Sequence, residues 1–440
     1  MKVLKFGGTS VGTPQRMKDV VSLINDGEQK IVILSAMSGT TNTLVEISDY
    51  LYKKNPEGAH ETINQLEAKY KKHLEELYTT EEYKQKTWST LHEIFEYIRS
   101  FTKGIFTMYE EKIIVGQGEL LSTHMVTNYL LECGINACLL PALEFMRTDK
   151  NGEPDLEYII ERLNLQLEKN PNKSIYITQG FICRNAYGEM DNLQRGGSDY
   201  TASLIGAAVK ASEIQIWTDI DGMHNNDPRI VDDTTPVSNL HFEEAAELAY
   251  FGAKILHPTC IQPAKFAGIP VKLLNTMDPS APGTVISNKT ENKRFKAVAA
   301  KDGITAINII SSRMLLAHGF LRKIFEIFET YKTSIDMICT SEVGVSLTID
   351  NTTHLTQIVN ELKKFGTVKI DEDMCIICVV GDLDWHNVGF ETQATDAMKS
   401  IPVRMISYGG STHNISFLVS GEDKKRALQA LSATLFSNAN

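Results

Sequence analysis

The stretch from residue 175 to 219 constrains the fold of this chain more than any other part of it. It opens with a short apolar run, 175–178, which predicts a buried strand. A helix is expected over 200–211, and a second run rich in β-branched and aromatic residues follows at 214–217. The order of strand, loop, helix and strand predicts a βαβ crossover. Open α/β sheets bind ligands where such strands end.

The loop before that helix, Arg195-Gly196-Gly197-Ser198-Asp199, contains the residues with chemical potential. Paired glycines allow the backbone to approach a ligand closely, and a helix N-terminus presents amide groups to an anion. We expect Ser198 or Asp199 to cap the first turn. Arg195 offers a planar fork for a carboxylate or phosphate. The carboxylate of Asp199 in such a place indicates that it orients a lysine or a metal, unless the segment is only a capped surface turn.

A second glycine loop follows the first expected strand, 3–6. Lys5 lies on that strand, so the lysine precedes the glycines and the loop is not the phosphate loop G-x-x-x-x-G-K-[ST]. A lysine in an apolar strand is costly to bury unless it meets an anion. We therefore expect Lys5 to face an anionic ligand above the glycine turn, unless the strand is only a chain end with the lysine in solvent.

Further polar groups follow the strand expected at 30–35, and residues 43–112 have the periodicity and Glu/Lys content of surface helices. Another helix is expected to begin at about Gly116, with Glu119 near its first turn, where the helix dipole favours a carboxylate. The loop 219–229, with its carboxylates and arginine, is typical of contacts to the edge of a nucleotide, or is a plain surface loop.

The C-terminal part repeats with a period of about 70 residues. Each copy has the order βαββαβ of a ferredoxin-like unit. Such a pair indicates either a small-molecule sensor that pairs with its neighbours or a simple dimerisation module. The expected domains are 1–290, 297–370 and 371–440.

The composition limits the partners and the compartment. Lys and Arg number 44 against 55 Asp and Glu, a formal charge of −11, which argues against a nucleic-acid binder. No apolar run reaches membrane-spanning length and the N-terminus does not resemble a signal peptide, so a cytoplasmic protein is expected. The seven scattered cysteines indicate reduced thiols. We expect no metal site, because Cys375 and Cys378 have no second cysteine pair.

Several motifs together resemble the aspartate kinase family: Lys5 to Gly12, Gly118 to Thr123, Arg195 to Ala202, Trp217-Thr218-Asp219 with Asp227-Pro228-Arg229, and Phe251 to Pro258. The resemblance covers essentially the whole chain, since the C-terminal repeat is similar to the paired ACT domains of that family. It implies an amino-acid kinase fold, which is an αβα sandwich, followed by two ACT domains. The chain resembles the monofunctional, lysine-sensitive form. The implied reaction is phosphoryl transfer from ATP, with Mg²⁺, to L-aspartate.

The resemblance also implies residue roles. Lys5 and Asp199 would be catalytic, with Asp199 positioning Lys5. Aspartate would be bound by Ser35, Thr41, Glu119, Phe181, Arg195 and Ser198, with Arg195 on its α-carboxylate and Glu119 near its amino group. ATP would be bound by Lys5, Gly7, Gly8, Ser10, Thr218, Asp219, His224, Asp227, Arg229 and Lys254, His224 standing where many relatives have tyrosine. A lysine effector would be bound by Met314, Gly319, Phe320, Asp336, Thr340, Ser341 and Glu342, across a homodimer or larger assembly formed through the ACT domains.

Three other functions compete with this interpretation. A kinase acting on glutamate or acetylglutamate would share the glycine loops, but the motif order and the terminal repeats weigh against it. A catalytically silent amino-acid sensor would have no need to keep both Lys5 and Asp199. A metal hydrolase would need a ligand cluster, which the sequence does not show.

Overall fold

The computed structural model describes residues 1–193, 196–252, 257–289, 291, 295–314 and 318–436. The chain divides into two compact units. The first contains residues 1–222 and 256–288, and the second contains 223–255 and 289–440.

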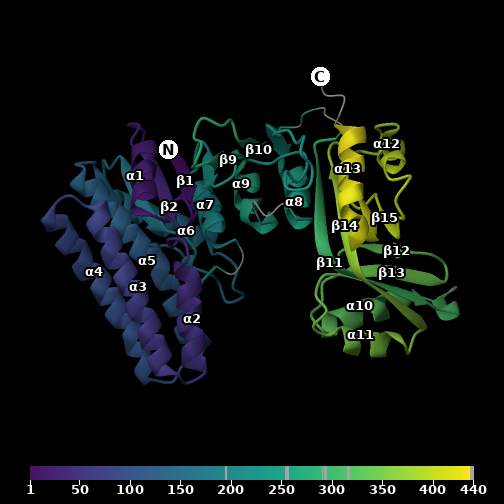
Figure 1. Ribbon diagram of the computed structural model, residues 1–440, viewed down its shortest axis with the longest axis horizontal. Coiled ribbons are helices and arrows are strands. Elements are labelled where there is room, and N and C mark those ends of the chain that lie inside the picture. The colour runs from purple at the N-terminus through teal and green to yellow at the C-terminus, as the bar shows by residue number, and fades with distance from the viewer. Residues whose placement is uncertain (194–195, 253–256, 290, 292–294, 315–317, 437–440) are drawn as a thin grey trace. The chain divides into compact units, whose positions relative to one another are not determined.

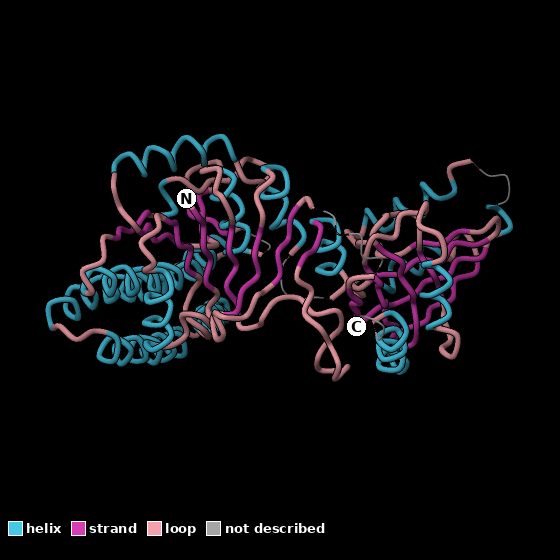
Figure 2. The backbone as a smooth tube through the Cα atoms, turned by 90° about the horizontal axis from the view of Figure 1, so that it is seen from above, coloured by secondary structure: helices cyan, strands magenta, loops and turns pink. Residues whose placement is uncertain are grey.

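The first unit contains a mainly parallel sheet. Its strands lie in the order β3 (Ala137–Leu140), β4 (Ile175–Gln179), β2 (Lys30–Leu34), β1 (Lys2–Phe6), β7 (Ile214–Thr218), β9 (Val271–Asn275), β10 (Thr284–Ser287). All neighbours are parallel except β9 and β10. Residues of β2 and β4 are buried without alternation, as expected for strands covered on both faces. Helices lie on both sides of these strands (Figure 2), and the expected αβα sandwich is confirmed.

The helices of this unit connect the parallel strands. They are α1 (Pro14–Ile24), α5 (Met108–Glu132), α6 (Leu156–Lys169), α7 (Gly197–Ala208) and α9 (Gln262–Ala267), with a hairpin of β5 (Ile182–Arg184) and β6 (Met190–Asn192) after β4. The charged region forms α2 (Thr40–Tyr52), α3 (Pro56–Leu77) and α4 (Glu81–Ser100), which pack beside α5 (Figure 1). Their buried stripe of aliphatic and aromatic side chains joins the core of the sheet.

The second unit contains a continuous antiparallel sheet. Its order is β12 (Ile338–Thr340), β13 (Gly344–Ile349), β11 (Ala297–Ile310), β14 (Thr367–Val380), β16 (Asn414–Ser420), β15 (Met405–Ser407). The helices are α10 (Phe320–Thr330), α11 (Leu355–Leu362), α12 (Phe390–Ala397) and α13 (Lys424–Leu435). Strand β8 (Asn239–His241) and helix α8 (Phe242–Tyr250) also belong to this unit, and α8 packs against β11 and β14.

The two ferredoxin-like copies share their central strands. Val298 lies in one core with Ile377 and Phe417, whereas Ile307 lies in another with Phe328 and Leu347. The pairing of β11 with β14 shifts register between these halves, near residues 301–306. The second copy therefore takes its fourth strand from the beginning of β11, and the expected boundary between 370 and 371 falls inside β14.

Two further expectations concern the compartment. No helix in the described ranges is both long and apolar enough to span a membrane. All seven cysteines are free thiols in the structure.

Candidate active site

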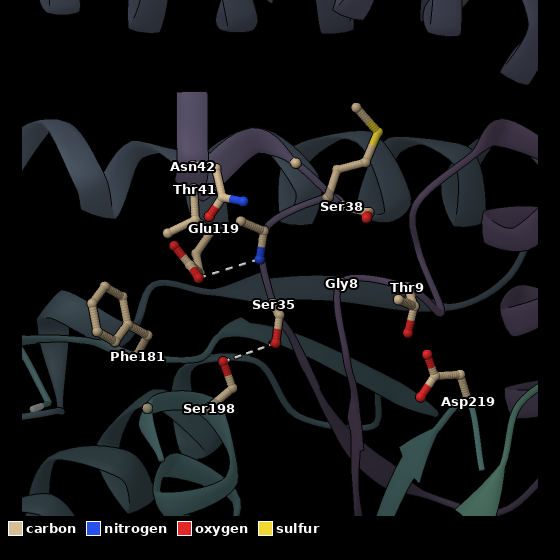
Figure 3. Close-up of a pocket in the computed structure, with 14 residues that line it drawn as sticks. Gly8, Thr9, Ser35, Ser38, Thr41, Asn42, Glu119, Phe181, Ser198 and Asp219 are labelled. Carbon is tan, nitrogen blue, oxygen red and sulfur yellow. Dashed lines mark hydrogen bonds between the residues drawn. The ribbon is translucent and has the colours of Figure 1, made fainter. Parts of the chain in front are cut away.

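A cavity of about 490 Å³ lies in the first unit, beyond the carboxyl ends of β1, β2, β4 and β7 (Figure 3). Half of the residues in its lining carry hydroxyl or carboxylate groups. The lining residues are Gly8, Thr9, Ser35, Ala36, Met37, Ser38, Gly39, Thr41, Asn42, Glu119, Phe181, Gly197, Ser198 and Asp219. The predicted residues Gly8, Ser35, Thr41, Glu119, Phe181, Ser198 and Asp219 are thus brought together from six segments of the sequence.

Two helix N-termini contribute to this cavity. Gly39 and Thr41 belong to the start of α2, and Gly197 and Ser198 to the start of α7. The amide groups and the positive dipole end of a helix N-terminus favour an anionic ligand. A site with two such ends suits a ligand that carries two carboxylates.

The expected side-chain cap of α7 is wrong. Its N-cap is Gly196, and no side chain caps the helix. Ser198 Oγ instead accepts a hydrogen bond of 2.9 Å from Ser35 Oγ across the cavity (Figure 3). Asp199 is engaged by a lysine, so both side chains serve the site and not the helix end.

Lys5 and Asp199 form an ion pair next to the cavity. Lys5 Nζ lies 2.6 Å from Asp199 Oδ1, and the two side chains are 12% and 17% exposed. Lys5 is on β1, between β2 and β7, at the centre of the sheet. An ammonium group has three donors, so the contact with one carboxylate oxygen leaves donors for a second anion. This geometry matches the interpretation that Asp199 orients a lysine.

Glu119 lies in the middle of α5, so the expected position in a first turn is wrong. Its side chain is buried, and Oε1 accepts a hydrogen bond of 3.2 Å from the Ala36 amide (Figure 3). Oε2 is buried and has no hydrogen-bond partner among the described residues. Burial raises the pKa of Glu119 to about 8. A buried carboxylate with a vacant acceptor is suited to a cationic ligand group.

Gly8 and Gly118 allow the chain to pack closely around Ala36, next to the cavity. A Cβ on Gly8 would lie 2.6 Å from Ala36 O, and a Cβ on Gly118 would lie 2.7 Å from Ala36 Cβ. Both distances are shorter than those between non-bonded atoms in a packed protein, so a side chain at Gly8 or Gly118 would force the chain to shift. Gly118 therefore lies inside α5 because the helix must approach β2 closely, and this is why the pair Gly116 and Gly118 does not mark a helix start.

Phe181 closes one end of the cavity in an uncommon backbone conformation. Its φ of 67° lies in the left-handed region, which costs a bulky residue free energy. The conformation is held by a hydrogen bond of 3.0 Å from the Phe181 amide to Thr201 Oγ1 and one of 2.8 Å from the Leu193 amide to Phe181 O. Such strain is characteristic of functional sites.

Some of the residues expected to bind the nucleotide belong to the first unit and others to the second. Ser10 is buried and its Oγ lies 2.7 Å from Thr276 Oγ1, while Gly7 follows β1 and Thr218 ends β7. His224, Asp227 and Arg229 belong to the second unit, where Arg229 forms an ion pair of 2.7 Å with Asp227. Arg195 and Lys254 lie outside the described residues.

The residues expected to bind the effector all belong to the second unit, and they have different environments. The Asp336 side chain is fully buried and forms polar contacts, Phe320 is in the apolar core, and Met314 packs against that core. The exposed residues are Gly319, Thr340, Ser341 and Glu342.

Sequence reasoning missed part of the cavity. Thr9, Ser38 and Asn42 line it, and their signal was their position in the same polar loops as predicted residues. It also missed a group in the second unit, His241, Glu243 and His413, whose donor atoms lie within 4.8 Å of one another. There His413 Nε2 is hydrogen-bonded to Glu243 at 2.8 Å, and the two imidazole rings stack.

Comparison with known proteins gives a consistent result. The model of the amino acid kinase family matches residues 1–275, and an ACT domain model matches 377–435. Lysine-sensitive aspartokinase 3 of Escherichia coli (strain K12) is 36% identical over 99% of both chains. The crystal structure of E. coli aspartokinase III with lysine and aspartate has a TM-score of 0.82 and 35% identity, and that with aspartate and ADP has 0.83 and 34%. Both cover 99% of this chain and all of theirs.

Proposed function

The chain belongs to the amino acid kinase family and, within it, to the aspartokinases, and from this premise we propose the following reaction. The protein transfers the γ-phosphate of ATP to the β-carboxylate of L-aspartate and so forms 4-phospho-L-aspartate. This reaction is the first step of lysine, threonine and methionine biosynthesis. The observation that carries the proposal is the cavity that places the buried, partly unpaired Glu119 among hydroxyl groups and two helix N-termini.

Aspartate has one ammonium and two carboxylate groups, and the cavity offers a complement to each. Glu119 Oε2 accepts from the ammonium group, which supplies the donor that this buried oxygen lacks. The α-carboxylate is held by Arg195 and the first turn of α7 near Ser198. Ser35, which is hydrogen-bonded to Ser198, and Thr41 also line the cavity, and Phe181 limits the length of the substrate.

The phosphoryl transfer needs charge neutralisation more than a base. The β-carboxylate is ionised at neutral pH and can attack the γ-phosphate of MgATP directly. Lys5, oriented by Asp199, stabilises charge on the transferring group. On the resemblance to aspartokinases we assign the phosphates to the turn that contains Gly7, Gly8 and Ser10. The magnesium ion enters with the nucleotide.

The nucleotide is held by residues from the loop that follows β7 and from the segments beyond it. Asp219 lines the cavity and Thr218 precedes it, so both suit the ribose and phosphate side of ATP. We assign His224, Asp227, Arg229 and Lys254 to the same ligand on the resemblance to aspartokinases.

Lysine is proposed as a feedback inhibitor. An E. coli relative with 35% identity has been solved with lysine bound, and the ACT copies of this chain provide Met314, Gly319, Phe320, Asp336, Thr340, Ser341 and Glu342 as the effector site. A homodimer formed through the ACT domains is the expected assembly, and the cytoplasm is the expected location.

The assay is direct. Purified protein is incubated with MgATP and hydroxylamine and, separately, with L-aspartate, L-glutamate or N-acetylglutamate, and the hydroxamate is measured. We expect product with aspartate only. Lys5→Ala should lower kcat by about 10²- to 10³-fold with a smaller change in the KM for aspartate, because Lys5 acts on the transferring phosphate.

Lys2→Ala is the matched control, since Lys2 lies on the same strand but pairs with Glu28 at 2.6 Å, away from the lining of the cavity. Near-normal turnover by Lys5→Ala would contradict the assigned role. The absence of product with all three acids, from protein that still binds lysine, would favour the silent sensor instead.

A further inference from the structure

The wall of the cavity at Phe181 is built from two segments that fit into each other. A Cβ on Gly180 would lie 2.4 Å from Ser198 Oγ, and a Cβ on Gly197 would lie 2.9 Å from Cδ2 of the Phe181 ring. Each glycine therefore makes room for a cavity-lining side chain of the other segment, Ser198 in one case and Phe181 in the other (Figure 3). The turn after β4 and the first turn of α7 consequently form one wall.

The hydroxyl group of Thr201 joins these two segments from behind. Oγ1 accepts a hydrogen bond of 3.0 Å from the Phe181 amide and donates one of 3.1 Å to Gly197 O. The bond to Gly197 is the usual local contact of a threonine inside a helix, whereas the bond from Phe181 comes from a residue 20 positions earlier. Thr201 is fully buried and is not part of the cavity lining. Water therefore cannot take the place of its hydroxyl.

The backbone at Phe181 depends on such contacts. Its φ of 67° is unfavourable for a bulky residue and persists only where the surrounding structure holds it. The Phe181 carbonyl accepts from the Leu193 amide, which attaches the turn to the end of its own hairpin. Within the described ranges, the hydrogen bond that attaches Phe181 to α7 is the one to Thr201.

The position of the Phe181 ring determines how long a substrate the cavity accepts. L-Aspartate and L-glutamate carry the same charged groups and differ by one methylene group. A well-fitted pocket distinguishes such a pair by about 10- to 200-fold in kcat/KM. That discrimination requires a wall that does not yield, and the ring packed against Gly197 is such a wall only while the backbone at Phe181 keeps its conformation.

We propose that Thr201 is a positioning residue that sets the length of the acid accepted by the kinase, because it holds Phe181 against α7. This inference rests on the proposed aspartate kinase activity. Without the hydroxyl, the Phe181 amide loses its acceptor, the backbone relaxes to a negative φ, and the ring leaves the wall. Glutamate then gains room, and aspartate loses the surface that it packs against. The ion pair of Lys5 with Asp199 does not include this hydroxyl, so turnover at saturating aspartate should change little.

The test compares Thr201→Ala with Thr201→Ser in the full-length chain, because both variants lose the methyl group and only the alanine loses the hydroxyl. Hydroxamate formation is measured over a range of L-aspartate and L-glutamate concentrations. We expect Thr201→Ala to raise the KM for aspartate about five- to tenfold, as for loss of one hydrogen bond, with kcat within about threefold of the unchanged chain. Product from glutamate relative to aspartate should rise about tenfold. Thr201→Ser should restore both values.

Thr178→Ala is the matched control. Thr178 lies on β4, shortly before Phe181, and is fully buried, but its hydroxyl has no hydrogen-bond partner among the described residues. Thermal unfolding of every variant checks that it is folded. Thr178→Ala should lose stability without a change in the KM for aspartate or in the preference between the two acids. Thr201→Val, which retains a branched side chain, replaces Thr201→Ala if the alanine variant does not fold.

Several results would overturn the inference. They are an unchanged KM for aspartate in Thr201→Ala, a raised KM with an unchanged preference between the acids, and a Thr201→Ser variant that behaves like Thr201→Ala. The same effects in Thr178→Ala would also overturn it, because loss of any buried hydroxyl would then suffice. If the unchanged chain uses aspartate and Thr201→Ala behaves like it, only the role of Thr201 falls. If the unchanged chain forms no hydroxamate from aspartate, the proposed kinase falls and this inference falls with it.

Discussion

At the scale of single residues, the first unit uses one buried carboxylate to prepare the site for its substrate. Glu119 has a hydrogen bond to one oxygen only, and it lies in a wall of small hydroxyl-bearing residues. In the absence of substrate the group favours its protonated form, because burial penalises the charge. Substrate binding must therefore include the ionisation of Glu119.

This leads to a pH dependence with a definite sign. The raised pKa of about 8 means that Glu119 is mostly protonated at pH 7, and it must lose its proton to accept a hydrogen bond from an ammonium group. Aspartate binding should release nearly one proton at pH 7. Its affinity should rise with pH, by up to about tenfold per unit, until the pH exceeds this pKa.

Calorimetry in two buffers of different ionisation enthalpy measures the proton release. Glu119→Gln should abolish the release and raise the KM for aspartate by about 10- to 100-fold, as expected for loss of a hydrogen bond to a charged group. Glu111→Gln is the control on the same helix, because Glu111 is hydrogen-bonded to Tyr52 outside the cavity. Equal heats in both buffers for the unchanged chain would show that Glu119 is already ionised.

At the scale of elements, the sequence predicts most of the strands that build the site, since β1, β2, β4 and β7 are short apolar runs followed at once by polar loops. It does not predict that Glu119 lies mid-helix. Glycines usually interrupt helices, and the close approach of α5 to Ala36 is a tertiary contact with no local signal. The same limit applies to Ser198, whose partner Ser35 is 163 residues away.

The contact between α5 and Ala36 predicts the effect of Gly118→Ala. Alanine improves helix propensity by about 1 kcal/mol, but overpacking against Ala36 and Thr40 costs roughly 1–3 kcal/mol, so the helix should shift or the protein should lose stability. Because the shift of α5 moves Glu119 relative to the Ala36 amide that donates to it, the KM for aspartate should rise.

Thermal unfolding and steady-state kinetics measure both effects of Gly118→Ala. Gly116→Ala provides the comparison, because it gains the same propensity but meets Met190 and Ile182 on another side of the helix. If both variants raise the KM equally, the contact at Ala36 does not position Glu119.

At the scale of the whole molecule, the sequence repeat and the packing units do not coincide. The repeat suggests two consecutive domains, but the two cores are built from shared strands, with 297–301 in one and 304–310 in the other. The periodicity of the sequence identifies the strands correctly. It cannot show that one long strand contributes to two cores, because both halves of that strand have the same apolar pattern.

Strand sharing predicts that the two cores lose stability together. Phe417 is fully buried in the second core, and Phe417→Ala should cost about 3–5 kcal/mol. Hydrogen exchange followed by mass spectrometry should then show faster exchange in 304–310 as well as in 297–301, because one continuous strand connects them.

Phe95→Ala serves as the control, since Phe95 is buried in the helical part of the first unit and should leave both segments protected. Unchanged protection of 304–310 in Phe417→Ala would mean that the cores unfold independently.

The shared strands also restrict how such a regulatory module can be exchanged between relatives. A chimaera with a crossover between 370 and 371 would join β14 from two parents within one ladder, and it would give the second core a foreign strand, because 297–301 would come from the other parent. A crossover placed before 295 instead transfers both cores as one cassette. Recombination in this family should therefore preserve the pair as a single inherited block.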